Sequence, residues 1–166
     1  MVDPHFKMLW NEDIPVIEHK DDQGHLTTID VIAGGLESTQ APDPTPNSWA
    51  ADPQNAVGVF TVKMEANATW TLPKTDLASN RSLFFYKGES LSIDGKRVSV
   101  EHAIRIRPDQ DIQVQNGPQD AYMLILQGRP INEPVVKHGP FVMNTEEEIR
   151  ETMKEYGRCK NDWISE

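Results

Sequence analysis

Histidines are the residues in this sequence with the clearest potential for metal chemistry, because imidazole nitrogens hold iron, copper and zinc. His5, His19 and His25 lie early in the chain, and the last two flank Asp21 and Asp22. These four side chains at 19–25 could form a surface metal site. Flexible segments do not hold ligands in register, so we expect exposed, solvated rings there instead.

The other reactive side chains form no recognisable catalytic group. Cys159 is the only cysteine, so the chain has neither a disulfide framework nor a CxxC pair. Glu146, Glu147 and Glu148 are consecutive, but at a predicted helix start they complement the helix dipole. The sequence contains no glycine-rich phosphate loop and no nucleophile elbow. We therefore assign no catalytic residue from the sequence.

Composition excludes several classes of partner. The 166 residues include 16 Lys plus Arg and 26 Asp plus Glu, which gives a formal net charge of −10. An acidic chain is repelled by phosphate backbones, so we expect no direct nucleic-acid binding. No apolar run approaches the roughly 20 residues that cross a bilayer. With no signal-peptide pattern at its start, the protein is expected to be cytoplasmic and not bound to a membrane.

Short strands separated by turns dominate the middle of the chain. Asp94-Gly95 suits the two-residue turn of a hairpin, with Leu91 and Ile93 predicted to face Val98 and Val100. About eight short strands at this spacing favour a barrel or jelly roll over a parallel α/β sheet. The predicted strands and hairpin cover residues 26–33, 57–64, 68–72, 83–86, 91–100, 103–106, 111–114 and 121–126.

Two segments are predicted to lie outside these strands. Residues 1–22 form an arm, in which Phe6, Leu9 and Trp10 need a surface to pack on. Residues 38–55 contain four prolines, which forbids a ladder strand and predicts a long surface loop. Trp49 in this loop is a candidate lid over a barrel mouth, with simple packing as the favoured alternative.

One amphipathic helix is predicted near the C-terminus. Thr145 and Glu148 have the spacing of a capping box, and Gly157 is expected to end the helix. The apolar face, at positions i, i+4 and i+7, consists of Ile149, Met153 and Tyr156.

Residues 128–145 read GRPINEPVVKHGPFVMNT, and this segment closely resembles the C-terminal signature of the pirin family. Asp3-Pro4-His5-Phe6 resembles the segment that joins the two pirin domains, and residues 29–34 resemble the first strand after it. Trp163 falls where the tail tryptophan of the family would. His138, inside the signature, is expected to order the chain around it.

The resemblance implies an all-β cupin, a double-stranded β-helix or jelly-roll barrel with a C-terminal α-helix. The barrel would cover residues 23–133, between the arm at 1–22 and the signature and helix at 134–166. It would be the second of the two barrels that pirins carry. Pirins bind iron through three histidines and a glutamate in the first barrel, so the resemblance implies iron only in an N-terminal domain that these residues do not include.

A metal-bearing cupin takes an H-x-H pair from one strand and a later histidine, because alternation points both members of the pair inward. No H-x-H pair occurs. Trp70 and Leu72 fall about where the pair would lie, and Gln113 falls near the later histidine. We therefore expect a metal-free barrel that is empty or holds an organic ligand. The residues expected to line it are Trp70, Leu72, Phe84 and Gln113.

The leading functional hypothesis is a non-catalytic domain that supports a partner barrel or forms a homodimer. One alternative is part of a quercetin (flavonol) 2,3-dioxygenase that needs an N-terminal metal cupin. Another is a barrel that binds a small aromatic ligand and is gated by the 38–55 loop. The expected partner interface consists of Phe6, Leu9, Trp10, Ile149, Met153 and Tyr156.

Overall fold

The computed structural model describes the backbone of residues 5–162 and the side chains of residues 5–158. Asp3, Pro4 and Trp163 lie outside the described residues, and the side chain of Cys159 is likewise not described. The chain divides into two compact units, one ending at Pro130 and one beginning at Ile131.

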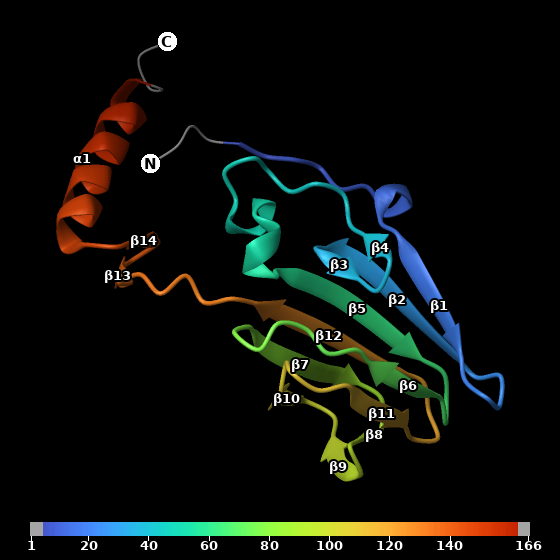
Figure 1. Ribbon diagram of the computed structural model, residues 1–166. Coiled ribbons are helices and arrows are strands. Elements are labelled where there is room, and N and C mark those ends of the chain that lie inside the picture. The colour runs from blue at the N-terminus through green and yellow to red at the C-terminus, as the bar shows by residue number, and fades with distance from the viewer. Residues whose placement is uncertain (1–4, 163–166) are drawn as a thin grey trace. The chain divides into compact units, whose positions relative to one another are not determined.

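Two large antiparallel sheets form most of the first unit (Figure 1). The six-stranded sheet has the order β1-β2-β5-β12-β7-β10, and the four-stranded sheet has the order β6-β11-β8-β9. In sheet order, the strands of the larger sheet are β1 (Val16–Lys20), β2 (Leu26–Ala33), β5 (Gly58–Met64), β12 (Ala121–Gly128), β7 (Asn80–Lys87) and β10 (His102–Arg105). Those of the smaller sheet are β6 (Thr69–Leu72), β11 (Ile112–Asn116), β8 (Ser90–Ile93) and β9 (Lys96–Ser99).

One hydrophobic core lies between these sheets. Phe60 and Ile125 of the larger sheet are fully buried, as are Leu72 and Val114 of the smaller one. Because alternate residues of a strand point to opposite faces, each strand buries every second side chain. Both sheets therefore pack face to face over a shared apolar interior.

The predicted hairpin is present, but one of the two predicted cross-strand pairs differs. Asp94 and Gly95 have φ values of 46° and 77°, as a two-residue hairpin turn requires. Leu91 pairs with Val98 as predicted. Ile93 pairs with Lys96 and not with Val100, because a two-residue turn fixes the register of the strands that leave it.

The arm and the proline-rich loop contain more structure than predicted. The arm includes a short 3₁₀ turn, η1 (Asn11–Asp13), and ends in β1, which pairs with β2. β3 (Gly35–Leu36) pairs with β4 (Thr39–Gln40), which lies before the first proline of the 38–55 loop. Two further 3₁₀ turns, η2 (Trp49–Ala51) and η3 (Pro53–Asn55), occupy the end of that loop.

The second unit is a β-hairpin followed by a helix. β13 (Val136–His138) pairs with β14 (Phe141–Met143), and α1 spans Glu146–Asp162. The predicted capping box is confirmed, since the Glu148 N–H donates to Thr145 Oγ1 at 3.2 Å and the Thr145 N–H donates to Glu148 Oε2 at 2.8 Å. The predicted stop at Gly157 is wrong, because this glycine stays helical and does not adopt the positive φ that ends a helix.

The part of the chain covered by the structure contains no helix that is both long and apolar enough to cross a membrane.

Candidate functional site

The barrel interior is the place where a cupin would hold a metal. Trp70 and Leu72 of β6 point into it, with exposed fractions of 4% and 0%. Phe84, also expected to line the interior, has an outward side chain that is 36% exposed. That expectation was wrong, because Leu83 and Phe85 take the inward positions on β7.

Gln113 also points outward. It lies on β11 between Ile112 and Val114, which are both buried, so alternation places its own side chain in solvent. The expectation that Gln113 lines the barrel was therefore wrong. Because its side chain points outward, Gln113 cannot contribute to a set of ligands inside the barrel.

The inward residues do not fit an iron site. Indole, aliphatic and thioether groups, such as Trp70, Leu72 and Met123, line the core and offer no imidazole or carboxylate. Within the described residues, no group of three or more His, Cys, Asp or Glu side chains is placed to hold a metal ion. Near the surface, His19 Nε2 lies 3.1 Å from Glu37 Oε1, and His25 Nδ1 lies 3.1 Å from Asp21 Oδ2.

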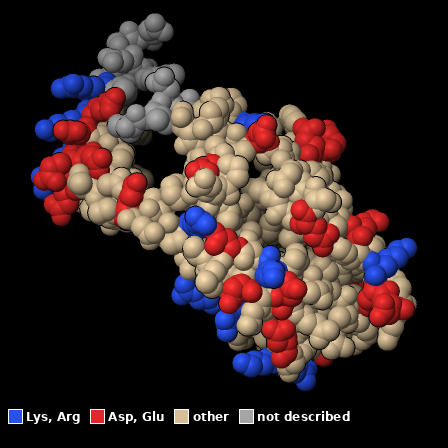
Figure 2. Space-filling model, in the orientation of Figure 1, with Lys and Arg blue, Asp and Glu red and all other residues tan. Residues whose placement is uncertain are grey.

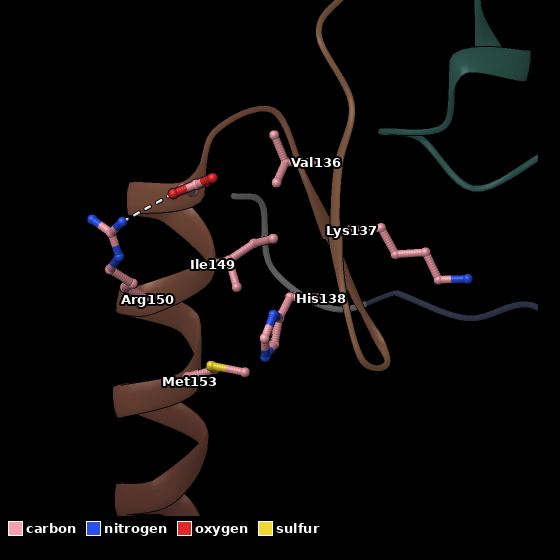
Figure 3. Close-up of a pocket in the computed structure, with 7 residues that line it drawn as sticks. Val136, Lys137, His138, Ile149, Arg150 and Met153 are labelled. Atoms are coloured by element: carbon pink, nitrogen blue, oxygen red, sulfur yellow. Dashed lines mark hydrogen bonds and ion pairs between the residues drawn. The ribbon is translucent and has the colours of Figure 1, made fainter.

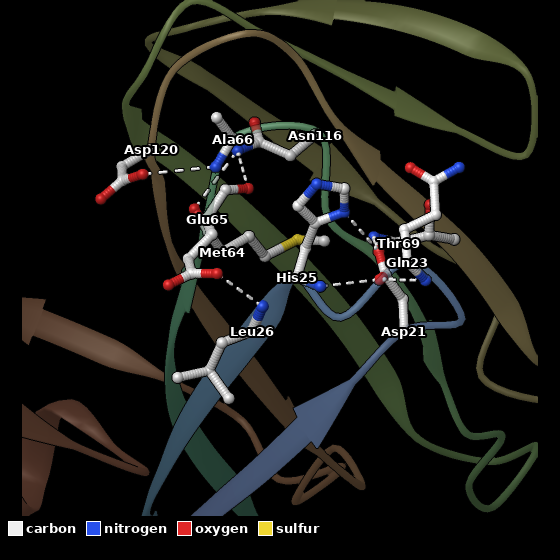
Figure 4. Close-up of polar contacts among 10 residues, drawn as sticks. All are labelled: Asp21, Gln23, His25, Leu26, Met64, Glu65, Ala66, Thr69, Asn116 and Asp120. Carbon is white, nitrogen blue, oxygen red and sulfur yellow. Dashed lines mark hydrogen bonds and ion pairs between the residues drawn. The ribbon is translucent and has the colours of Figure 1, made fainter.

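At one end of the barrel, polar side chains connect neighbouring strands and turns (Figure 4). Asp21 Oδ1 accepts the backbone N–H groups of Gln23 and His25 at 2.9 Å, and Oδ2 accepts that of Thr69 at 3.0 Å. Burial raises the pKa of Asp21, but hydrogen bonds from His25 and Thr69 outweigh it and lower the pKa to about 2. The carboxylate thereby joins the β1–β2 turn to the start of β6.

Asn116 makes further hydrogen bonds at the same end of the barrel (Figure 4). Its Nδ2 donates to the carbonyl oxygens of Met64 at 3.2 Å, Glu65 at 2.8 Å and Gln119 at 2.7 Å. Its Oδ1 accepts the Gly117 N–H at 2.8 Å. These hydrogen bonds satisfy the polar atoms of Asn116 itself. Thr27 Oγ1 and Trp70 Nε1, near the same end, have no partner among the described residues, and Asp21, Thr69 and Trp70 line a cavity of about 410 Å³ there.

The opposite end of the barrel contains buried polar atoms without partners. Arg81, on β7, is only 1% exposed and donates from Nη1 to the Pro73 carbonyl at 2.6 Å. Among the described residues, no partner is found for Arg81 Nε, Ser79 Oγ or Gln127 Oε1. Gln127 of β12 pairs directly with Arg81, so both side chains point to the same face of the sheet.

A cleft of about 440 Å³ opens at this end, and Ser79 and Arg81 line it together with Arg105 and Arg107. Burial lowers the pKa of Arg81 to about 10, although the charge of Asp111 opposes that effect. On the face of the first unit shown in Figure 2, basic and acidic side chains are interspersed, without an extended area of one sign. The cluster of three arginines is therefore a local feature of an acidic chain.

A second cavity, of about 410 Å³, lies beneath the proline-rich loop. Thr75 and Gln127 line it, as do Ala50 and Ala51 next to the candidate lid residue Trp49. Trp49 itself is 40% exposed, and its indole Nε1 donates to the Arg129 carbonyl at 3.2 Å. The indole is thus attached to the chain that follows β12.

The second unit has a groove of its own, lined by both apolar and charged side chains (Figure 3). Val136, His138, Ile149 and Met153 line this groove of about 270 Å³ between the hairpin and the helix. Ile149, assigned to a partner interface from the sequence, is only 4% exposed because it packs within this unit. That assignment was therefore wrong for Ile149.

The other expected interface residues remain accessible. Phe6 and Trp10 of the arm are 88% and 60% exposed, and Leu9 is 40% exposed. On α1, Met153 and Tyr156 are 38% and 63% exposed. None of these residues lines the cleft at Arg81.

Sequence reasoning missed Ser79, Arg81, Asn116 and Gln127. For Arg81, Asn116 and Gln127, the signal that could have found them is the alternation of inward and outward side chains along each strand. Each of the three lies two residues from an inward-pointing apolar residue on its own strand: Arg81 from Leu83, Asn116 from Val114 and Gln127 from Ile125. A polar residue at an inward-pointing position near the end of a strand therefore indicates a mouth of the barrel.

The paired antiparallel sheets and their shared core define an all-β cupin, as expected from the sequence. The family model of the pirin C-terminal cupin domain matches residues 59–162, so the chain belongs to the pirin family through this domain. The resemblance of residues 128–145 to the pirin signature is thereby confirmed.

Individual relatives agree with this family. A pirin-like protein of Solanum lycopersicum is 30% identical over 97% of this chain and 52% of its own length. A putative quercetin 2,3-dioxygenase of Pseudomonas aeruginosa is 34% identical over 45% of this chain and 26% of its own. A crystal structure of quercetin 2,3-dioxygenase from Acinetobacter baumannii superposes with a TM-score of 0.73 at 25% identity, over 92% of this chain and 49% of that one. The chain thus spans about half the length of the curated pirin-like relative that it matches throughout.

Proposed function

We propose that this chain is a cupin domain without a catalytic metal, whose role is to support and recognise a partner cupin barrel. The observation that carries the proposal is the inward face of β6, which consists of Trp70 and Leu72, about where the family resemblance would put an H-x-H pair. An interior of this kind stabilises a barrel but supplies no ligands to a redox metal. We infer that the chain is not an enzyme by itself.

The outer face of the six-stranded sheet offers a surface for such a partner. Phe84 and Leu124 are directly paired on β7 and β12, and Leu126 further along β12 is 38% exposed. The rings of Tyr86 and Tyr122 lie 6.4 Å apart on the same face. Neighbouring exposed apolar residues are typical of interaction surfaces. We assign this face to the partner barrel, because the pirin-like relative of Solanum lycopersicum is about twice as long as the segment that matches.

Light scattering tests this proposal. The chain is mixed with the unmatched half of the Solanum lycopersicum relative, and the mass of the eluted species is measured at micromolar concentrations. We expect a one-to-one complex that the substitution Phe84→Glu abolishes. Gln113→Glu is the matched control, because Gln113 is exposed on the smaller sheet and away from the proposed surface. A homodimer of the chain alone would instead favour a second copy as the partner.

A second candidate function is part of a quercetin 2,3-dioxygenase. It is supported by the similarity to proteins of Pseudomonas aeruginosa and Acinetobacter baumannii that carry this name. Metal analysis of the purified chain distinguishes it from our proposal. Stoichiometric iron, copper or nickel that persists after chelation would contradict the metal-free proposal for this chain.

A third candidate is a barrel that binds a small aromatic molecule beneath the 38–55 loop. The 410 Å³ cavity next to this loop supports it, because that volume is in the range of small-molecule sites. A ligand that prefers the native state raises the melting temperature. A rise with flavonols that Trp49→Ala diminishes would favour this function over a purely structural one.

A further inference from the structure

We propose that the cleft at Arg81 binds a small organic carboxylate, with the guanidinium of Arg81 holding the carboxylate group. This site is separate from the outer sheet face assigned to a partner barrel. It is also lined by different residues from the cavity beneath the proline-rich loop.

The charge of Arg81 is the first reason. A buried cation is costly unless an anion and hydrogen bonds compensate it. Arg81 is 1% exposed, yet within residues 5–158 it forms no ion pair within 4 Å. Asp111 acts on it only as a more distant charge. The Nε–H group also lacks an acceptor, so the guanidinium has both unmet charge and an unmet donor.

The neighbouring arginines are already engaged, which singles out Arg81. Arg105 Nη2 donates to Asn80 Oδ1 at 2.6 Å, and Arg107 Nη2 lies 2.8 Å from Asp109 Oδ2. Both reach the cleft because β10 pairs with β7, and the Ile106 N–H donates to the Arg81 carbonyl at 3.0 Å. They add positive potential around the cleft, and Arg81 is the arginine of the three that has no acceptor on a side chain among the described residues.

The remaining lining residues indicate the class of ligand. Ser79 Oγ is buried and has no partner among the described residues, so its hydroxyl can donate to a second carboxylate oxygen. Leu77, Ile106 and Pro108 supply apolar contacts around the same cleft. A planar guanidinium matches the geometry of a carboxylate, and the volume of about 440 Å³ suits a small molecule. We therefore assign the site to a carboxylate on an apolar body and not to an inorganic oxyanion.

Titration of the full chain with benzoate, acetate and phosphate tests the proposal, with affinity measured by calorimetry and the Arg81 Nε–H signal followed by NMR. We expect saturable benzoate binding that shifts this signal, weaker acetate binding, and the weakest binding for phosphate. Arg81→Lys keeps the charge but removes the fork of donors, so the benzoate Kd should rise about tenfold or more.

Two milder variants keep the test decisive if Arg81→Lys fails to fold. Ser79→Ala removes a hydroxyl without a partner, so it should leave the melting temperature unchanged and still weaken benzoate and acetate binding. Leu77→Ala, at a side chain that is 72% exposed, should weaken benzoate binding and leave acetate binding unchanged. Arg97→Gln, at an exposed position on β9, is the matched control and should change neither affinity.

Three results would overturn the proposal. The first is the absence of saturable carboxylate binding to the natural chain. The second is benzoate binding that survives Arg81→Lys and Ser79→Ala unchanged. The third is phosphate binding as tight as that of benzoate, which would assign the cleft to an inorganic oxyanion.

Discussion

Asn116 is the residue whose replacement tests most directly how one end of the barrel is held together. Its amide nitrogen donates to three backbone carbonyls, two of them at the end of β5 and just beyond it, and one ahead of β12. An amide nitrogen has two hydrogens, so one of these contacts is shared and two full hydrogen bonds are lost in Asn116→Ala. The Gly117 N–H keeps an acceptor in that variant, because it also donates to the Ser90 carbonyl.

The Glu65 carbonyl keeps a donor in the variant, because it also accepts the Ala68 N–H at 3.1 Å. A carbonyl left without a donor costs about 1–3 kcal/mol, so Asn116→Ala should lower the free energy of unfolding by about 1–3 kcal/mol. For a domain of this size, about 2 kcal/mol corresponds to a fall in Tm of roughly 4–8 °C. Urea denaturation followed by far-UV circular dichroism gives the free energy, and a thermal scan gives the Tm.

Two further variants identify the cause. Gln115→Ala removes the neighbouring outward side chain of β11 and should change stability by less than about 0.5 kcal/mol. Asn116→Asp keeps the acceptor but turns an oxygen toward the carbonyls, so it should destabilise the fold at neutral pH and recover partly on acidification. If Asn116→Ala were no more destabilising than Gln115→Ala, the hydrogen bonds of the amide would not be what holds this end of the barrel together.

Other predictions concern pH, backbone geometry and the helix start. The pKa of Asp21 is lowered from 3.8 to about 2, so the contribution of this carboxylate to the free energy of unfolding is complete above about pH 4 and is lost as the pH falls toward 2. In an acid titration, Asp21→Asn should therefore show a smaller fall of Tm over this range. Gly34 and Gly95 both have positive φ, but an added Cβ would lie 1.9 Å from the Val57 carbonyl oxygen at Gly34 and meet nothing within 4 Å at Gly95. Gly95→Ala should cost about 1 kcal/mol and Gly34→Ala more than about 3 kcal/mol in urea denaturation; equal costs would contradict the steric argument. Thr145→Ala should cost the second unit about 1 kcal/mol and speed amide exchange in the first turn of α1, whereas unchanged exchange there would show that the capping box is dispensable.

The sequence predicted the strands well because alternation and turn residues are local signals. β2 occupies the predicted residues 26–33, and the turn at Asp94-Gly95 occurs where expected. β1 was missed because a five-residue strand at a sheet edge takes its regularity from pairing with β2 and not from its own pattern. Gly157 was misjudged because a glycine ends a helix only where the chain turns to positive φ, which nothing in the local sequence requires.

The lining of the barrel was harder to predict than its strands. The run from Leu83 to Phe85 is wholly apolar, so it contains no alternation from which the inward phase could be read, and Phe84 was placed on the wrong face. Gln113 was assigned by its position relative to a family motif, although its buried neighbours on β11 give the correct phase. Wherever at least one polar residue interrupts a strand, the alternation of apolar and polar residues is therefore a better guide to side-chain direction than the position relative to a family motif.

The contrast between the two ends of the barrel connects these observations. Asp21 and Asn116 join strands at one end through hydrogen bonds that are complete within the chain. Arg81 and Gln127, at the other end, are as firmly placed by the pairing of β7 and β12, yet they leave buried polar atoms without partners in the described residues. Unmet buried polarity is unfavourable in a domain that only has to be stable. At Arg81 it coincides with a buried cation that forms no ion pair among the described residues, which supports the proposal that this mouth binds a carboxylate.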